Sequence, residues 1–156
     1  DFEFVVVPFK EIEFSYFMIK LVLKRLGIKC FPGKRQKPSN LPYYLLLIES
    51  FAILVVSLYS YFILVNGGLL LFILLILVPD LSLFGYALGT RFGSIVYNCF
   101  HTYLIPGSLI ALGLIIGSNL TIAISLIWLV HIAQDRARGY GLRYLDTVEG
   151  SHLHNV

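Results

Sequence analysis

The feature that most limits this chain is a long stretch almost without charge. Between Leu41 and Leu129 the only charged residues are Glu49, Asp80 and Arg91. No water-soluble fold of this size can bury so much apolar surface, since soluble domains are about a quarter charged. The composition agrees, because 58% of the residues are hydrophobic and 13% are charged. We therefore predict an integral membrane protein.

Turn residues divide this stretch into four apolar spans. The spans run from about Pro42 to Val65, Leu69 to Leu88, Phe92 to Ile116 and Leu120 to Asp135. A helix needs roughly 20 residues to cross the hydrocarbon core, and the last span is short unless arginines at its end extend to the interface. The turns are too short for anything but antiparallel neighbours. We predict an all-α fold, an up-down-up-down bundle of four transmembrane helices within residues 41–145.

The loop charges predict the orientation of these spans. The turns at 66–68 and 117–119 carry no charge, whereas the opposite side holds the basic residues Lys34, Arg35, Lys37, Arg91, Arg136, Arg138 and Arg143. By the positive-inside rule, this basic side is cytoplasmic. We expect a multi-pass protein of the inner (plasma) membrane, with both termini and the tail at 146–156 in the cytoplasm. The formal charge of +3 then needs no nucleic-acid partner.

Residues 1–40 differ in character from the spans. Phe14 to Ile28 can form a basic amphipathic helix on the surface of the inner leaflet, and Cys30 to Asn40 is typical of a basic linker. The alternative interpretation is a stretch without fixed structure. We expect this N-terminal extension to be dispensable for membrane insertion.

Ionisable residues inside the spans form the candidate site. Each costs roughly 2.5–3.5 kcal/mol in the hydrocarbon region and normally faces the bundle interior. Every span carries at least one, and a rise of ~1.5 Å per residue places all of them in the cytoplasmic half of the bilayer. They are Glu49, Asp80, His101, His131 and Asp135. His131 and Asp135 are four residues apart and therefore project from one helix face.

This set of side chains predicts a divalent metal site, because imidazole and carboxylate are usual ligands of zinc and manganese. We expect Asp80, His101, His131 and Asp135 to converge as ligands. Glu49 and Asp80 are the candidate catalytic carboxylates, with Glu49 as a base or a further ligand. The alternative interpretation is a hydrogen-bond and ion-pair network that specifies helix packing.

Neighbouring residues extend this polar site. Tyr97 and Asn98 precede His101 by four and three residues, so they share its helix face. Arg136 lies at the cytoplasmic mouth. Prolines next to Asp80 and shortly after His101, at positions 79 and 106, are expected to open both helices there.

Three strings of residues resemble a known family. They are Val78-Pro79-Asp80-Leu81-Ser82 with Gly85-Tyr86, then Tyr97-Asn98 to His101-Thr102-Tyr103, then His131 to Asp135-Arg136 with Gly139-Tyr140-Gly141-Leu142-Arg143-Tyr144. Together they resemble the domain of unknown function 4260 family of small bacterial four-helix membrane proteins, over about Leu41 to Leu153. The resemblance implies an architecture and no activity.

Two functions are compatible with these residues. The first is a metal-dependent hydrolase that acts on a lipid or other amphiphile from the cytoplasmic leaflet. The second is a non-enzymatic carrier or assembly subunit whose polar cluster is structural or a proton relay. A carrier would form a homo-oligomer, because four helices enclose little volume. The arginines at 136, 138 and 143 either bind an anionic lipid headgroup or anchor the helix end.

Overall fold

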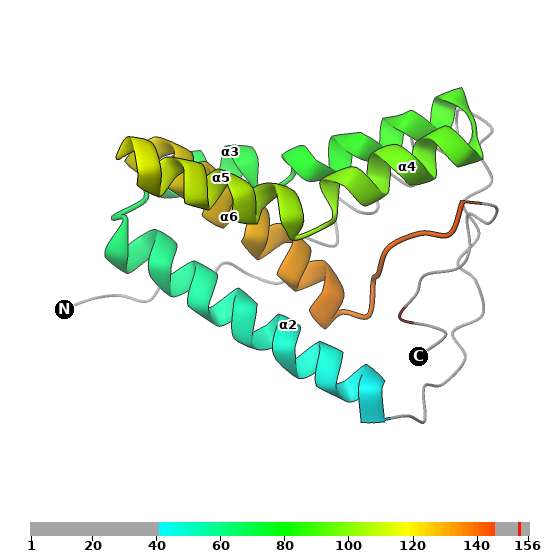
Figure 1. Cartoon of the computed structure of the whole chain (residues 1–156), viewed down its shortest axis with the longest axis horizontal. Helices are drawn as coiled ribbons and strands as arrows, with labels where there is room; N and C mark the ends of the chain where they lie inside the picture. Colours follow the sequence, from blue (N-terminus) through cyan, green and yellow to red (C-terminus); the bar gives the residue numbers. More distant parts are fainter. Residues whose placement is uncertain (1–40, 146–152, 154–156) are drawn as a thin grey trace. The chain divides into compact units, whose positions relative to one another are not determined.

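The computed structural model describes residues 41–145 and Leu153. The N-terminal extension and the rest of the tail lie outside the described residues. Within 41–145 every regular element is helical (Figure 1). In chain order the elements are α2 (Leu41–Tyr59), the π-helical turn η1 (Ser60–Leu64), α3 (Leu69–Leu75), the 3-10 helix η2 (Val78–Leu88), α4 (Thr90–Phe100), α5 (Leu104–Ile116) and α6 (Asn119–Ala137).

These elements combine into four helical stretches that are long and apolar enough to cross a membrane. In the described residues they are Leu41–Leu64, Leu69–Leu88, Thr90–Ile116 and Asn119–Ala137. The prediction of an all-α chain with four such spans is confirmed. The last span continues past its predicted end at Asp135, so its 19 residues come close to the length that a bilayer requires.

Helix α6 is the most buried of the helices. It packs against both α2 and α5, and η2 packs separately against α4. A buried cluster joins Tyr61 of η1 to Ala123, Leu126 and Ile127 of α6. Large apolar side chains on the other helices are exposed, as lipid-facing surfaces of a membrane protein should be. Helix α6 therefore supplies the packing surface that the other spans share.

Pro79 interrupts the second span. Proline has no backbone N–H, so the carbonyl of Leu75 loses its normal helical donor and α3 ends at that residue. The chain continues as the 3-10 helix η2, in which the N–H of Asp80 donates to the carbonyl of Leu77 at 3.1 Å. This change of helix type sets the direction in which Asp80 leaves the backbone.

Pro106 interrupts the third span in the same way. Its missing N–H leaves the carbonyl of Thr102 without a helical donor, and the helix is broken between Phe100 and Leu104 (Figure 1). His101 lies in this break, with φ −110° and ψ 17°. The prediction that both prolines open their helices is confirmed.

Glycines allow η2 and α4 to approach closely. A Cβ atom added to Gly93 would lie 2.7 Å from the Cα atom of Tyr86, and one added to Gly85 would lie 3.4 Å from the Cα atom of Gly93. The buried hydroxyl of Tyr86 lies 3.2 Å from that of Ser94 across the same contact. These small residues thus allow η2, which carries Asp80, to pack closely against α4, which ends just before His101.

We predict that Gly93→Ala lowers the stability of the folded protein by about 1–3 kcal/mol, because the new methyl group meets backbone that cannot rotate away. The measurement is the thermal unfolding midpoint in detergent, followed by circular dichroism. Gly107→Ala is the matched control, since a Cβ there meets nothing within 4 Å. Equal midpoints for the two variants would contradict the prediction.

Candidate metal centre

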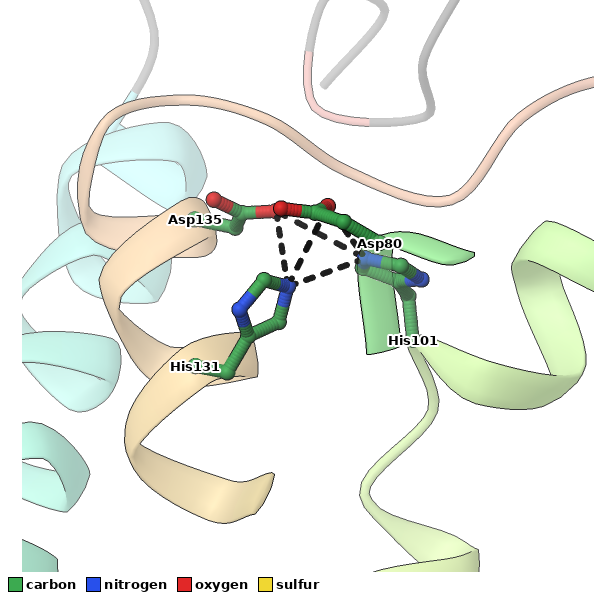
Figure 2. A group of neighbouring side chains, drawn as sticks. All are labelled: Asp80, His101, His131 and Asp135. Atoms are coloured by element: carbon green, nitrogen blue, oxygen red, sulfur yellow. Dashed lines mark hydrogen bonds and ion pairs between the residues drawn. The ribbon is translucent and has the colours of Figure 1, made fainter. Parts of the chain in front are cut away.

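Four ionisable side chains from three of the spans meet at one point (Figure 2). Asp80 comes from η2, His101 from the end of α4, and His131 and Asp135 from successive turns of α6. One ligand atom from each lies within 4.8 Å of all the others. The two imidazoles are about 95% buried, and each carboxylate is 20% exposed. The predicted convergence of these four side chains is confirmed.

The separations between these atoms have the size expected around a metal ion. The two Nε2 atoms are 3.3 Å apart. The histidine nitrogens lie 3.5–3.8 Å from the carboxylate oxygens of Asp80 and Asp135. Good hydrogen bonds between such groups are roughly 2.7–2.9 Å long, whereas tetrahedral ligands about 2.0–2.1 Å from zinc are about 3.3 Å from one another. The distances fit a shared central ion better than a directly bonded network.

The other nitrogen of His101 faces a backbone carbonyl. Nδ1 of His101 lies 3.0 Å from the carbonyl oxygen of Tyr97. An N–H donated to a carbonyl leaves the lone pair on the opposite nitrogen, which is the form that binds metal. The Nε2 atom of His101 is therefore oriented as a ligand, and it lies 3.3 Å from Nε2 of His131.

Aromatic stacking holds His101 in place. The Tyr97 ring lies 3.8 Å from the His101 ring at an interplanar angle of 13°, as their four-residue spacing predicts. Asn98 has a different task, since its side chain exchanges two hydrogen bonds of 2.7 Å with the backbone N–H and carbonyl of Arg143. Of the residues predicted to extend the site, Tyr97 supports a ligand and Asn98 fixes the segment after α6.

Side chains of α6 bond the carbonyls that the break in the third span exposes. The indole N–H of Trp128 donates to the carbonyl of Phe100 at 2.7 Å, and Arg136 donates to the carbonyl of His101 at 3.5 Å. The Trp128 ring also stacks on Phe100, with centroids 5.5 Å apart. Unsatisfied carbonyls are costly where no water is present. These bonds therefore fix the broken helix beside the site.

Helix α6 ends directly after the last ligand. Gly139 adopts a left-handed conformation with φ 85°. The N–H of Gly139 donates to the carbonyl of Arg136, and the N–H of Tyr140 donates to that of Asp135, each at 2.9 Å. This is the paired C-terminal motif that glycine permits. It turns the chain across the site, where Gly141 is buried.

Not every predicted site residue joins the group. Glu49 is exposed on α2 and is not one of the four residues that lie together. The bond between Trp128 and the carbonyl of Phe100 was not predicted from the sequence. The expected opening of the third span near Pro106 was the available signal, because a carbonyl that loses its helical donor needs another.

A narrow hollow reaches the group from one side. His101, Asp135, Arg136 and Tyr140 contribute to its lining. It has no room for a substrate-sized molecule in this conformation.

The comparison with known families gives one result. Residues 44–156 match a family described as a domain of unknown function (DUF4260). The chain belongs to this family. The match covers all four ligands of the candidate centre and all of the segment after α6. No curated protein and no solved structure shows significant similarity to this DUF4260 chain.

We predict that Trp128→Phe lowers the free energy of unfolding by about 1 kcal/mol, because it retains the ring and removes only the donor to Phe100. Thermal unfolding in detergent measures the change. Ser108→Ala is the control, since it removes an exposed hydrogen bond to the carbonyl of Leu104 within an intact helix. A midpoint for Trp128→Phe as high as that of the control would show that the bond is not needed.

Proposed function

We propose that this chain is a membrane-embedded metalloprotein that holds one divalent cation, zinc or manganese. The ligands are Asp80, His101, His131 and Asp135. The observation that carries the proposal is that each separation involving a histidine nitrogen is 3.3–3.8 Å, while all four ligand atoms lie within 4.8 Å of one another. Two carboxylates also neutralise a divalent ion, which lowers the cost of holding charge inside an apolar bundle.

The activity we propose is metal-dependent hydrolysis of a lipid or other amphiphile. A bound metal polarises a carbonyl or phosphoryl group and activates water at neutral pH. The partial exposure of both carboxylates supports access from one side. Asp80 serves here as a ligand. We assign Glu49 no ligand role, because it lies outside the group.

A second candidate function is non-enzymatic, with a metal that fixes the three helices together. The specific observation in its favour is that four protein side chains are enough to complete a tetrahedral shell. Structural zinc sites are closed in this way, whereas catalytic ones keep an open position. Proton-relay, carrier and assembly roles belong to this same class.

The proposed topology alternates the four spans, with both termini in the cytoplasm of a cell bounded by a plasma (inner) membrane. The support is the distribution of arginines, which flank Thr90 and the end of α6 but not the other two turns. The proposed partners are the lipids of the cytoplasmic leaflet, including anionic headgroups at the arginines after α6, and a second copy of the chain.

We predict that the purified full chain holds about one divalent ion and that His131→Gln and Asp135→Asn each reduce the bound metal at least roughly tenfold, because a tetrahedral site loses one ligand in each. Elemental analysis by mass spectrometry measures the content. Glu49→Gln, also an acidic residue of a span, is the matched control and should keep its metal. Circular dichroism verifies that each variant is folded.

Two results would overturn the metal proposal. The first is wild-type protein that holds no zinc, manganese or cobalt after each is added in excess. The second is unchanged metal content in folded His131→Gln and Asp135→Asn proteins.

The topology is tested with single cysteines in a chain whose native cysteines are replaced by Cys30→Ser and Cys99→Ser. Gly68→Cys and Asn119→Cys occupy exposed positions in the uncharged turns, and Thr90→Cys is exposed at the start of α4. We expect the first two to react with an impermeant thiol reagent added to intact cells, and Thr90→Cys to react only after permeabilisation. The opposite labelling pattern would place the site in the other leaflet.

A further inference from the structure

Within the described residues, Arg136 is the cation that lines the hollow at the proposed metal site. It follows the ligand Asp135 in sequence, and it lines the same hollow as the ligands His101 and Asp135. Its guanidinium donates to the backbone carbonyl of His101 at 3.5 Å. It also lies over the ring of Tyr103, 4.5 Å from the ring centre. Metal ligands and guanidinium therefore face one space.

The guanidinium is only half-buried, but within the described residues it forms no ion pair with a carboxylate. Its two contacts, a long bond to a neutral carbonyl and the face of an aromatic ring, leave most of its five N–H donors available. Arg138 and Arg143 each have another interaction, so we consider Arg136 alone. A guanidinium in this position is a binding group for an anion.

The charges at the site indicate how much negative charge is needed. A divalent ion and the two carboxylates cancel, and imidazoles that bind through a lone pair are neutral. Arg136 then leaves one positive charge next to apolar surroundings, where an unbalanced charge is costly. One anionic ligand offsets the charge of Arg136.

We propose that a monoanionic phosphate group binds at the outer edge of this hollow, held between the metal and the guanidinium of Arg136. Different oxygens of one tetrahedral phosphate can reach the two partners, and arginine pairs with phosphate in a fork geometry. The phosphate belongs either to a membrane phospholipid or to a soluble phosphodiester. This inference rests on the proposed metal site, for which it names the substrate class.

The test uses the full chain loaded with cobalt(II) in a non-ionic detergent, because the visible absorption of cobalt reports on its ligands. Dimethyl phosphate, a soluble monoanion, is titrated in one series and phosphatidylglycerol in mixed micelles in another. Trimethyl phosphate, which is neutral, is the ligand control. We expect a saturable spectral change with at least one of the two anions and none with trimethyl phosphate.

Arg136→Gln should raise the half-saturating phosphate concentration roughly ten- to hundredfold, the effect of losing charge-assisted hydrogen bonds, while cobalt content stays unchanged. Arg91→Gln is the matched control, because this residue lies in the first turn of α4 and not in the lining of the hollow. If Arg136→Gln does not fold, Arg136→Lys keeps the charge and removes the fork, and should also weaken binding.

The outcomes separate the two proposals. Saturation by phosphatidylglycerol at far lower concentration than by dimethyl phosphate identifies a lipid headgroup, and equal potency identifies a soluble phosphodiester. A cobalt-loaded protein that responds to neither anion, responds equally to trimethyl phosphate, or responds unchanged after substitution of Arg136 overturns the phosphate inference and leaves the metal site intact. Failure to hold cobalt overturns both.

Discussion

The need to satisfy backbone carbonyls where water is absent governs the arrangement of this protein. Pro79 and Pro106 each remove a helical donor from an apolar span, so the helices around them cannot continue unchanged. Two bonds to carbonyls at the break in the third span come from α6. Trp128 reaches the carbonyl of Phe100, and Arg136 reaches that of His101. Helix α6 therefore stabilises the break in the third span.

The same breaks place half of the candidate centre. His101 leaves the chain at the end of α4, where the helix has opened, and Asp80 leaves it in the first turn of a 3-10 helix. His131 and Asp135 need no such device, because a regular helix puts residues four apart on one face. A rigid pair on α6 thus faces two ligands whose positions depend on irregular backbone. The contacts that stabilise the helix breaks therefore also position Asp80 and His101 in the site.

Local chemistry made much of this predictable from the sequence. The spans follow from apolar length, the breaks follow from missing N–H groups, and the pair on α6 follows from helical spacing. Glu49 shows where such reasoning stops. A rise per residue gives the depth of a side chain along its helix, but it does not give the direction in which that side chain points around the axis. Glu49 shares the predicted depth of the ligands and is nevertheless exposed.

Contacts between distant segments were the other part that the sequence left open. The bonds between Asn98 and Arg143 join residues 45 positions apart, and that between Trp128 and Phe100 spans 28. Each depends on which faces of two elements meet, a property of the packed chain and not of either segment alone. A missing backbone N–H predicts that a carbonyl needs another hydrogen-bond donor, but the identity of that donor depends on how the helices pack.

The candidate centre is buried on the side of its imidazoles and partly exposed on the side of its carboxylates. The imidazoles are buried, while the two carboxylates keep 20% of their surface exposed. The carboxylates are thus the exposed part of the group, and Asp135 and Arg136 line the adjoining hollow. Zinc expands from four to five ligands during catalysis, so an anion entering beside Arg136 need not displace a protein ligand. In that arrangement the four side chains hold the helices together without an anion, and the guanidinium of Arg136 selects the anion that binds to the ion.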